Sequence, residues 1–326
     1  MRNARRGRAL RPLAAGLGVF AILAVPGLVT APRVALADSL PSSPSYSFYV
    51  SGSWGNYVTF NGQQVLYAYE EGYYANPGAS ANIVIDFHRQ EYSSTYGWGV
   101  CEDSCVYYSD TWVKAVAQAF INGYAAGHTA TSVIAAGVSN DDYNYACTAT
   151  SVATAWASAG TAWSQVLNGL VAQYNTDVEA ANDIEDWQTG SWNACGAGAE
   201  NWLYAFTNGT ASQDLMQDFG SDGNAENSSA WTVAQVYDVS WGIGLAVPLP
   251  EIYCNGQQTE WAGTIRKYGT MVFSGVTSEN GSYWGSPCAS STNYYTYTWQ
   301  QSWDQLESAL VSNGFSNDLD SVVTIF

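Results

Sequence analysis

Short apolar runs alternate with amphipathic stretches from residue 81 onward, and this order restricts the fold more than any other feature of the sequence. The runs expected to form strands are 82–88, 132–138, 177–185, 202–206, 249–253 and 271–276. The stretches with helical periodicity are 110–124, 151–174, 260–268 and 299–313. Residues 231–241 fit both periods, and we favour a helix there. Strands separated by helices favour a parallel sheet in an α/β fold.

The number of strand and helix units then selects among parallel sheets. With about six to eight units, a TIM-like (β/α) barrel, which need not be complete or regular, is favoured over an open doubly wound sheet. No glycine-rich phosphate-binding motif follows any of the strand runs, which argues against a nucleotide-binding sheet. We expect a single barrel domain at 81–326, preceded at 38–80 by a β-rich or irregular lead-in that is rich in Tyr, Ser and Gly.

Residues 1–37 have the features of a secretory signal peptide. Five arginines and no acidic residue occur in the first eleven positions, an apolar run from Leu13 to Val29 follows, and Ala35-Leu36-Ala37 supplies the small residues that a signal peptidase requires. Arg33 and the nearby prolines argue against a permanent membrane span, so an uncleaved anchor helix is the less favoured alternative. We expect cleavage after Ala37 and a secreted, extracellular protein.

The charge of the processed chain excludes two classes of partner. Cleavage removes six arginines and no acidic residue, which leaves four basic residues against 28 acidic ones and a formal charge of −24. Such a surface repels phosphate backbones and anionic lipids. No other stretch approaches about 18 apolar residues, the length that a membrane helix needs. We therefore expect no nucleic-acid partner, no membrane span after processing, and a monomer.

The cysteines indicate disulfides rather than a metal site. All six follow the leader, an even number in a chain expected to be exported, and they predict three disulfides. They are Cys101, Cys105, Cys147, Cys195, Cys254 and Cys288. Residues 101–105 are expected to form a small local loop, and the other four cysteines permit three connectivities, among which the sequence does not decide. Because only His88 and His128 could join a metal site and no C-x-x-C occurs, we expect no metal and no cofactor.

Candidate catalytic residues occur where the expected strand 177–185 ends, because barrels of this kind carry their functional residues at the carboxyl ends of strands. Asp183 and Glu185 are two residues apart, so on a strand they share a face, with carboxyls about 6 to 7 Å apart along the chain. Two acids this close resist ionising together, which raises the pKa of one and makes it a candidate general acid. Glycoside hydrolysis needs two such groups. A solvated loop is the plainer alternative, because D-x-E arises often among 28 acidic residues.

Polar and aromatic residues near strand ends and in loops are candidates for substrate contacts. The chain has 14 Trp and 23 Tyr, which supply flat apolar faces with polar rims that suit sugar rings. The tryptophans on helical stripes are expected in the core instead: Trp112, Trp156, Trp163, Trp261 and Trp303. The predicted substrate-binding residues are Asp86, His88, Asn140, Trp187, Asn208, Trp241 and Tyr253. For His88 a purely structural role is the favoured alternative.

Several segments resemble a family of exported, largely uncharacterised proteins of actinobacterial type. The resemblance is carried by Ala180-Ala181-Asn182-Asp183-Ile184-Glu185, Asn208-Gly209, Leu249-Pro250-Glu251-Ile252-Tyr253 and Phe273-Ser274-Gly275-Val276-Thr277, and it spans roughly residues 80 to 312. A first strand ending in Asp86 and a later one ending in D-x-E are more distantly similar to muramidase-type and chitinase-type glycosidase barrels. That resemblance implies that Glu185 donates the proton and that Asp183 supports it.

Three functions remain open on the sequence alone. The favoured one is a secreted glycoside hydrolase-like protein that acts on a cell-wall or environmental polysaccharide. The second is a barrel that binds glycan without cleaving it, as an adhesin or lectin would; it is motivated by the aromatic content and by the lack of a clearly placed second catalytic glutamate. The third is a structural or inhibitor-like exported protein, for which the acidic surface and the disulfides would suffice.

Overall fold

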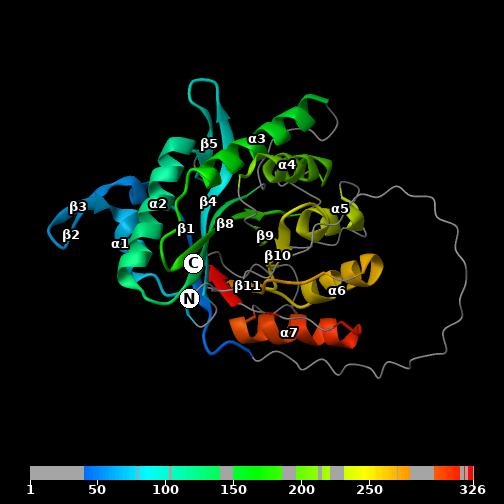
Figure 1. Cartoon of the computed structure of the whole chain (residues 1–326). Helices are drawn as coiled ribbons and strands as arrows, with labels where there is room; N and C mark the ends of the chain where they lie inside the picture. Colours follow the sequence, from blue (N-terminus) through cyan, green and yellow to red (C-terminus); the bar gives the residue numbers. More distant parts are fainter. Residues whose placement is uncertain are drawn as a thin grey trace, which may run out of the picture. The chain divides into compact units, whose positions relative to one another are not determined.

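Eight parallel strands form the centre of the computed structural model (Figure 1). They are β1 (Ser45–Tyr49), β4 (Asn82–Ser93), β7 (Ser132–Ser139), β8 (Thr176–Asp183), β9 (Met216–Asp218), β10 (Ala246–Pro248), β11 (Val276–Glu279) and β12 (Val322–Ile325). The hydrogen-bonded order is β10-β9-β8-β7-β4-β1-β12-β11, and every pair in it is parallel. Spatial order therefore follows chain order around the sheet.

The two ends of this path, β10 and β11, meet in what we call the seam. Glu251, just after β10, forms an isolated parallel bridge with Thr277 of β11. Thr277 N donates to Pro250 O at 2.8 Å, and Ile252 N donates to Thr277 O at 3.0 Å. The sheet thus returns on itself as a (β/α) barrel whose last junction is a single bridge rather than a ladder, which confirms the α/β barrel class and its expected irregularity.

The structure describes residues 40–78, 81–102, 105–139, 150–185, 196–211, 215–220, 231–269, 271–279, 297–315, 319 and 322–325. All of them belong to one unit, Leu36–Phe326, and the predicted leader lies outside the described residues. Within the described part of the chain, no helix is both long and apolar enough to span a membrane.

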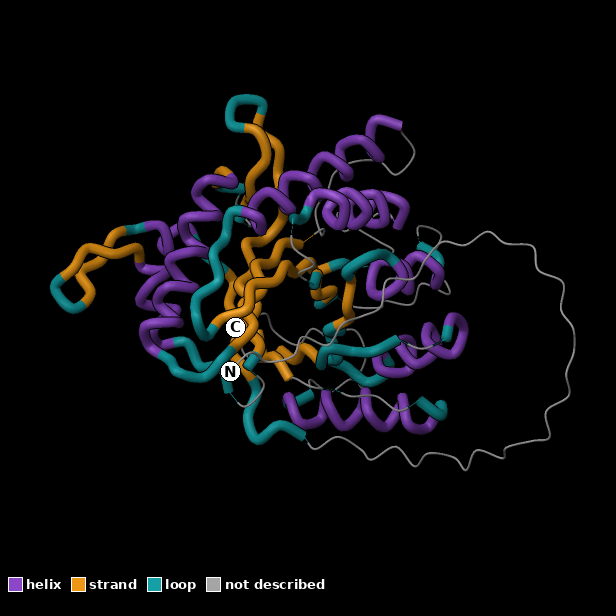
Figure 2. The backbone as a smooth tube through the Cα atoms, viewed as in Figure 1, coloured by secondary structure: helices purple, strands orange, loops and turns teal. Residues whose placement is uncertain are grey.

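Every connection between consecutive barrel strands contains a helix. The helices are α1 (Tyr67–Tyr74), α2 (Asp110–Gly127), α3 (Thr150–Asn168), α4 (Gly196–Gly209), α5 (Val233–Tyr237) with the π-helical turn η3 (Asp238–Gly242), α6 (Gln257–Tyr268) and α7 (Trp299–Ser312). They surround the strands (Figure 2). Thr298 and Thr232 begin α7 and α5 with capping boxes, in which each threonine and the glutamine three residues later satisfy backbone N–H groups.

Tryptophans fill the space between helices and strands, as their helical spacing predicts. Trp156, Trp163, Trp261 and Trp303 are at most 2% exposed, and Trp112 is partly buried against the same core. Burying such large apolar faces stabilises the fold by about 25 cal/mol per Å² removed from water.

Several boundaries differ from the sequence-based expectation. Residues 202–206, expected as a strand, lie in α4: Trp202 and Phe206 are buried and Tyr204 is exposed, which is a helical period rather than a strand period. Helix α3 ends at Asn168 rather than at residue 174. A strand was expected at 271–276, whereas β11 runs from Val276 to Glu279. The short strands β9 and β12 had no counterpart in the prediction.

The lead-in contributes to the barrel. It does contain strands, but β1 pairs with β4 and β12, so the barrel begins at Ser45 rather than at residue 81. The hairpin of β2 (Tyr57–Phe60) and β3 (Gln63–Leu66) turns at Asn61 and Gly62, which both have positive φ, as a tight two-residue turn of primed type requires. A second antiparallel arm extends β4 through β5 (Gly97–Cys101) and β6 (Tyr107–Ser109).

One of the predicted disulfides lies within this arm. Cys101 and Cys105 are bonded, which confirms the small local loop expected at 101–105. Cys254 is also disulfide-bonded, so its partner is among Cys147, Cys195 and Cys288, which lie outside the described residues.

Candidate functional site

An apolar layer inside the barrel sets the positions of the candidate site. Val84, Ala135, Ala181, Phe219 and Leu249 form a cluster of their own, separate from the core beneath the helices, and each is fully buried. Side chains alternate along a strand, so the residue two positions beyond a member of this layer also faces the barrel interior. On β4 and β8 this rule places Asp86 and Asp183 above the layer, two positions beyond Val84 and Ala181. Glu251 follows Leu249 by the same two positions, just after β10 ends at Pro248.

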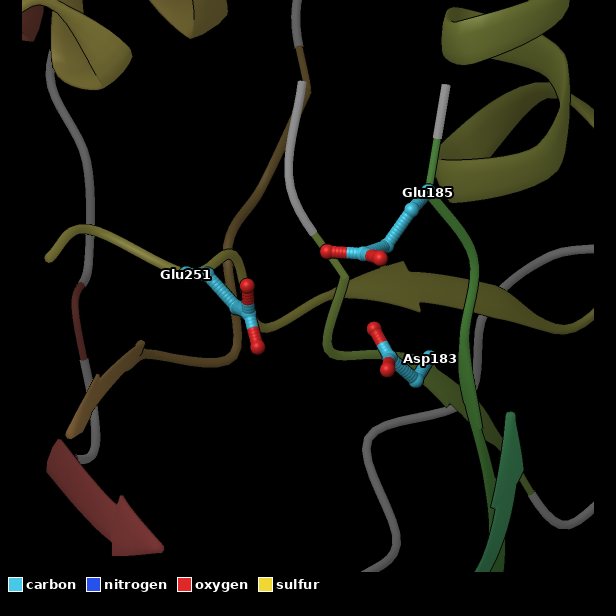
Figure 3. A group of neighbouring side chains, drawn as sticks. All are labelled: Asp183, Glu185 and Glu251. Atoms are coloured by element: carbon cyan, nitrogen blue, oxygen red, sulfur yellow. The ribbon is translucent and has the colours of Figure 1, made fainter. Parts of the chain in front are cut away.

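Three carboxylates converge there (Figure 3). One oxygen each from Asp183, Glu185 and Glu251 can be chosen so that all three lie within 4.8 Å of one another. Asp183 is the last residue of β8, Glu185 follows two residues later, and Glu251 reaches in from the seam. Glu185 is 8% exposed and Glu251 is 6% exposed, so these two are largely withdrawn from bulk water, whereas Asp183 is half-buried.

The backbone and a tyrosine fix the orientation of Glu251. Its N–H donates to Gly220 O at 3.2 Å, and its bridge to Thr277 holds it from the other side. The Tyr253 hydroxyl donates a hydrogen bond to the Glu251 carboxylate. Burial, followed by the negative charge of Glu251, raises the pKa of Tyr253 well above its ordinary value, so the phenol keeps its proton and remains a donor.

A second tyrosine lies beside all four acids. Burial raises the pKa of Tyr49 well above its ordinary value, and the charges of Asp86, Asp183, Glu251 and Glu185 add to that shift in this order. Tyr49 also packs against the apolar layer. Two protonated phenols, Tyr49 and Tyr253, therefore accompany the carboxylates.

Asp86 and His88 border this group. The His88 backbone is left-handed, with φ of 62°, and its N–H donates to Asp86 Oδ1 at 3.0 Å. The His88 ring stacks on Tyr49 with centroids 5.5 Å apart, and Nε2 lies 3.1 Å from Val50 O. A carbonyl oxygen only accepts, so Nε2 carries a proton. A strained backbone next to a cluster of acids is typical of functional sites.

The arrangement permits two kinds of chemistry. Carboxylates this close repel one another in a site of low dielectric, so the group favours holding a proton, which is the requirement for a general acid facing a second carboxylate. Oxygen ligands from three acids are also what a hard divalent cation prefers. Asp183, Glu185 and Glu251 are the residues that would hold such an ion.

The structure brings together five of the residues predicted for the site: Asp183, Glu185, Asp86, His88 and Tyr253. Asn208 lies in the last turn of α4, so it does not follow a strand and the position on which its role was predicted is wrong. Trp241 lies in η3, partly buried against the helix-facing core. Asn140 and Trp187 lie outside the described residues.

Glu251 and Tyr49 are the functional candidates that the sequence interpretation missed. Glu251 lies inside the run 249–253 that was expected to be a strand, so a search for acids at strand ends could have found it. Tyr49 lies in the lead-in, which was not expected to contribute a barrel strand. Only the pairing of β1 with β4 shows that it does.

No family model matches the sequence, and no curated protein sequence does. Among solved structures, a modular endo-β-1,4-mannanase from Cellulomonas fimi, described with the family 26 glycoside hydrolases, has 9% identity and a TM-score of 0.43, covering 86% of this chain and 64% of the mannanase. A family 26 β-mannanase from Bacteroides ovatus has 10% identity and a TM-score of 0.39, covering 86% of this chain and 80% of that one. The chain thus spans less than two thirds of the first enzyme. Neither is a muramidase or a chitinase, so that part of the resemblance stays a prediction.

Proposed function

We propose that this chain is an exported glycoside hydrolase that cleaves a cell-wall or environmental polysaccharide, with Glu185 as the general acid. The observation that carries the proposal is the convergence of Asp183, Glu185 and Glu251 above the apolar layer at the carboxyl end of the barrel. Glycoside hydrolysis requires two carboxyl groups on either side of the scissile bond, and this group supplies them.

In the proposed reaction, Glu185 donates its proton to the glycosidic oxygen as the bond to the anomeric carbon breaks. Asp183 lies two residues deeper along the same chain segment, so its charge keeps the proton on Glu185 until the leaving oxygen takes it. The sugar rings would lie against aromatic side chains near the site, where the half-buried His88 ring stacks on Tyr49 with centroids 5.5 Å apart.

Glycan binding without cleavage is the second candidate. It was motivated by the aromatic content and by the lack of a clearly placed second catalytic glutamate, and the proximity of Glu251 to Glu185 supports catalysis over binding alone. The two candidates differ in a simple way: a binding protein gives a calorimetric signal with a polysaccharide but releases no reducing ends.

Replacing Glu185 tests the proposal. The purified protein is incubated with soluble galactomannan, glycol chitin, mixed-linkage β-glucan and bacterial peptidoglycan, and reducing ends are measured. Glu185→Gln should lower the rate by about 10² to 10⁴-fold, because general acid catalysis contributes that much, while the circular dichroism spectrum is unchanged. Asp177→Asn is the matched control, since Asp177 is an exposed acid at the opposite end of β8.

Two results would end the hydrolase proposal: unchanged turnover in Glu185→Gln, or binding of a polysaccharide with no product after long incubation. Export is tested separately by sequencing the amino terminus of protein recovered from the culture medium, which should begin at Asp38.

A further inference from the structure

We infer that the antiparallel arm, which the end of β4 forms with β5 and β6, binds an uncharged polysaccharide chain at a distance from the reacting bond, with Tyr96 as the platform for a sugar ring. This inference rests on the proposed function, because the polysaccharide proposed there is the occupant. It adds a second binding surface outside the carboxylate group. The surface is the side of the arm that carries Glu91 and Tyr107, which we call the inner face.

The inner face of the arm continues the face of the barrel sheet that carries Asp86. β4 and β7 pair at Asp86 and Gly137 and again at Arg89 and Ser139, so β4 has one extra residue between the two pairs. Paired residues share a face of the sheet, and so do Gly137 and Ser139, which are two positions apart on β7. Arg89 therefore faces the same side as Asp86, and Glu91 follows two positions later. A polymer that reaches the carboxylates can continue along this side of the arm.

The opposite face of the arm is fixed against a helix. Trp98 Nε1 donates to Ser158 Oγ of α3 at 2.9 Å, and Tyr92 packs edge-on against the Trp98 ring with centroids 5.4 Å apart. The disulfide between Cys101 and Cys105 closes the base of the arm. A hairpin alone is marginally stable in water, so these contacts hold the arm in one orientation. Figure 2 shows its turn standing clear of the helices.

Tyr107 lies along β5 on the inner face. It pairs with Cys101, which in turn pairs with Arg89, so the three residues share this face. The Tyr107 hydroxyl donates to Gly97 O at 2.8 Å. A Cβ at Gly99 would lie 2.7 Å from the same hydroxyl oxygen, so the phenol occupies space that any other side chain at 99 would fill. The two glycines thus leave room for an aromatic ring to lie over the strand.

Tyr96 is both fixed and exposed. Its ring stacks on that of Tyr107, with centroids 6.0 Å apart and planes inclined by 19°. Its N–H donates to Ser93 Oγ at 3.3 Å, which holds the backbone of the turn. The side chain is nevertheless 71% exposed. Because the ring is already ordered, a ligand that stacks on it loses little affinity to the immobilisation of a side chain.

The chemistry of the inner face favours an uncharged sugar polymer. A phenol offers a flat apolar face with a polar rim, which suits a sugar ring. Burial raises the pKa of Tyr107, and the negative charges of Asp110 and Glu91 add to that shift, so two acids border the platform. Carboxylates accept hydrogen bonds from sugar hydroxyls but repel anionic polymers. We therefore expect an uncharged polysaccharide rather than a polyuronate.

The platform is too far from the carboxylate group to contact the sugars at the reacting bond. β4 continues for seven residues from Asp86 to Ser93, so the turn lies about 20 Å beyond Asp86 at about 3.3 Å per residue. Only a chain of several sugar units can contact both places at once. The arm would thus favour long polymers over short fragments.

Affinity electrophoresis measures the contribution of Tyr96. The gels contain the soluble polymers of the panel above, and all variants carry Glu185→Gln so that the polymer is not degraded. Tyr96→Ala should raise the Kd by about 10-fold, the size of one aromatic contact, whereas Tyr96→Phe keeps the ring and should bind as the parent does. Tyr57→Ala is the matched control, because Tyr57 belongs to the other hairpin and is 72% exposed.

The outcomes separate this inference from the hydrolase proposal. Equal affinity of Tyr96→Ala and the parent would overturn the inference, whether or not the wild type releases reducing ends. Binding that depends on Tyr96, without any product from the wild type, would support the arm as a glycan-binding surface and end the hydrolase proposal. A parent that binds none of the polymers would overturn the inference, and the absence of reducing ends would then overturn both.

Two further measurements test the identity of the occupant. Polygalacturonate, an anionic polymer, should retard the parent much less than the uncharged polymers do, and equal retardation would overturn the choice of an uncharged ligand. Sedimentation of the wild type should show a monomer. A dimer that Tyr96→Ala dissociates would mean that the platform binds a second copy of this chain, which would overturn the inference.

Discussion

The two ends of the barrel interior carry polar layers of opposite character on either side of the apolar layer. At the amino-terminal end, Asn82 donates to Gln217 Oε1 at 3.0 Å, and Gln217 donates to Glu179 Oε2 at 2.8 Å. The carboxylate of this layer, that of Glu179, thus accepts a hydrogen bond from an amide side chain, which is itself bonded to a second amide. At the carboxyl-terminal end, Asp86, Asp183, Glu185 and Glu251 share a small region with two tyrosines.

This difference separates stability from function. A buried amide network satisfies its own donors and acceptors, so it holds strands together. Like charges placed together raise the free energy of the folded state, and proteins retain such arrangements where activity requires them. The comparison therefore predicts opposite responses to substitution at the two ends.

The largest effect on stability is expected at the amino-terminal layer. Gln217→Leu removes the donor to Glu179 and the partner of Asn82, and should lower the free energy of unfolding by about 2 kcal/mol. Urea denaturation measures this. Gln165→Leu, at an exposed position on α3, is the control and should change stability by less than about 0.5 kcal/mol. Equal effects at the two positions would show that the amino-terminal layer does not stabilise the fold.

A change of opposite sign is expected at the carboxyl-terminal layer. Asp183→Asn relieves repulsion among the three carboxylates, so it should raise the free energy of unfolding by about 1 kcal/mol at pH 7. At pH 4 more of the parent's carboxylates carry a proton than at pH 7, so the repulsion is weaker and the gain should shrink. Urea denaturation at both pH values measures it, with Asp177→Asn as control. A gain that does not depend on pH would contradict the electrostatic origin.

The smallest effect concerns alkaline pH. Because the pKa of Tyr49 is raised in the folded state, the unfolded chain releases this proton first as pH rises past about 10, and stability falls from there. Tyr49→Phe should remove less than about 1 kcal/mol of that loss at pH 10.5. The same measurement on Tyr57→Phe, where Tyr57 is 72% exposed, provides the matched comparison. Identical curves for the two variants would argue against burial of the Tyr49 hydroxyl.

Much of the barrel was predictable because its longer elements have clear periods. β4, β7, β8, α2, α6 and α7 were expected close to their observed positions. The segments that were predicted wrongly are short or continuously apolar. β9 has only three residues, too few to show an alternation of apolar and polar side chains, and residues 202–206 form an apolar run of the kind that a buried strand also has. Tertiary packing, rather than local pattern, decides such segments.

The site divides in the same way. Asp183 and Glu185 are only two residues apart, so their proximity was predictable from the sequence, although the strand was expected to continue to 185 and β8 ends at Asp183. Glu251 lies far along the chain and meets them only because β10 stands two strands away from β8 in the sheet. No local sequence pattern indicates that Glu251 approaches Asp183 and Glu185 in space. For the same reason, the sequence alone could not show that the Tyr253 hydroxyl donates to the Glu251 carboxylate.

The seam gives this barrel an uneven resistance to heat. Glu251 forms both the single bridge that closes the ring and one side of the carboxylate group. Fraying of β10 from β11 needs fewer broken contacts than melting the long ladders between β4, β7 and β8. On warming, we therefore expect the proposed hydrolytic activity to be lost while the far-ultraviolet circular dichroism is still native, so that this activity would report the opening of one junction and not the collapse of the whole domain.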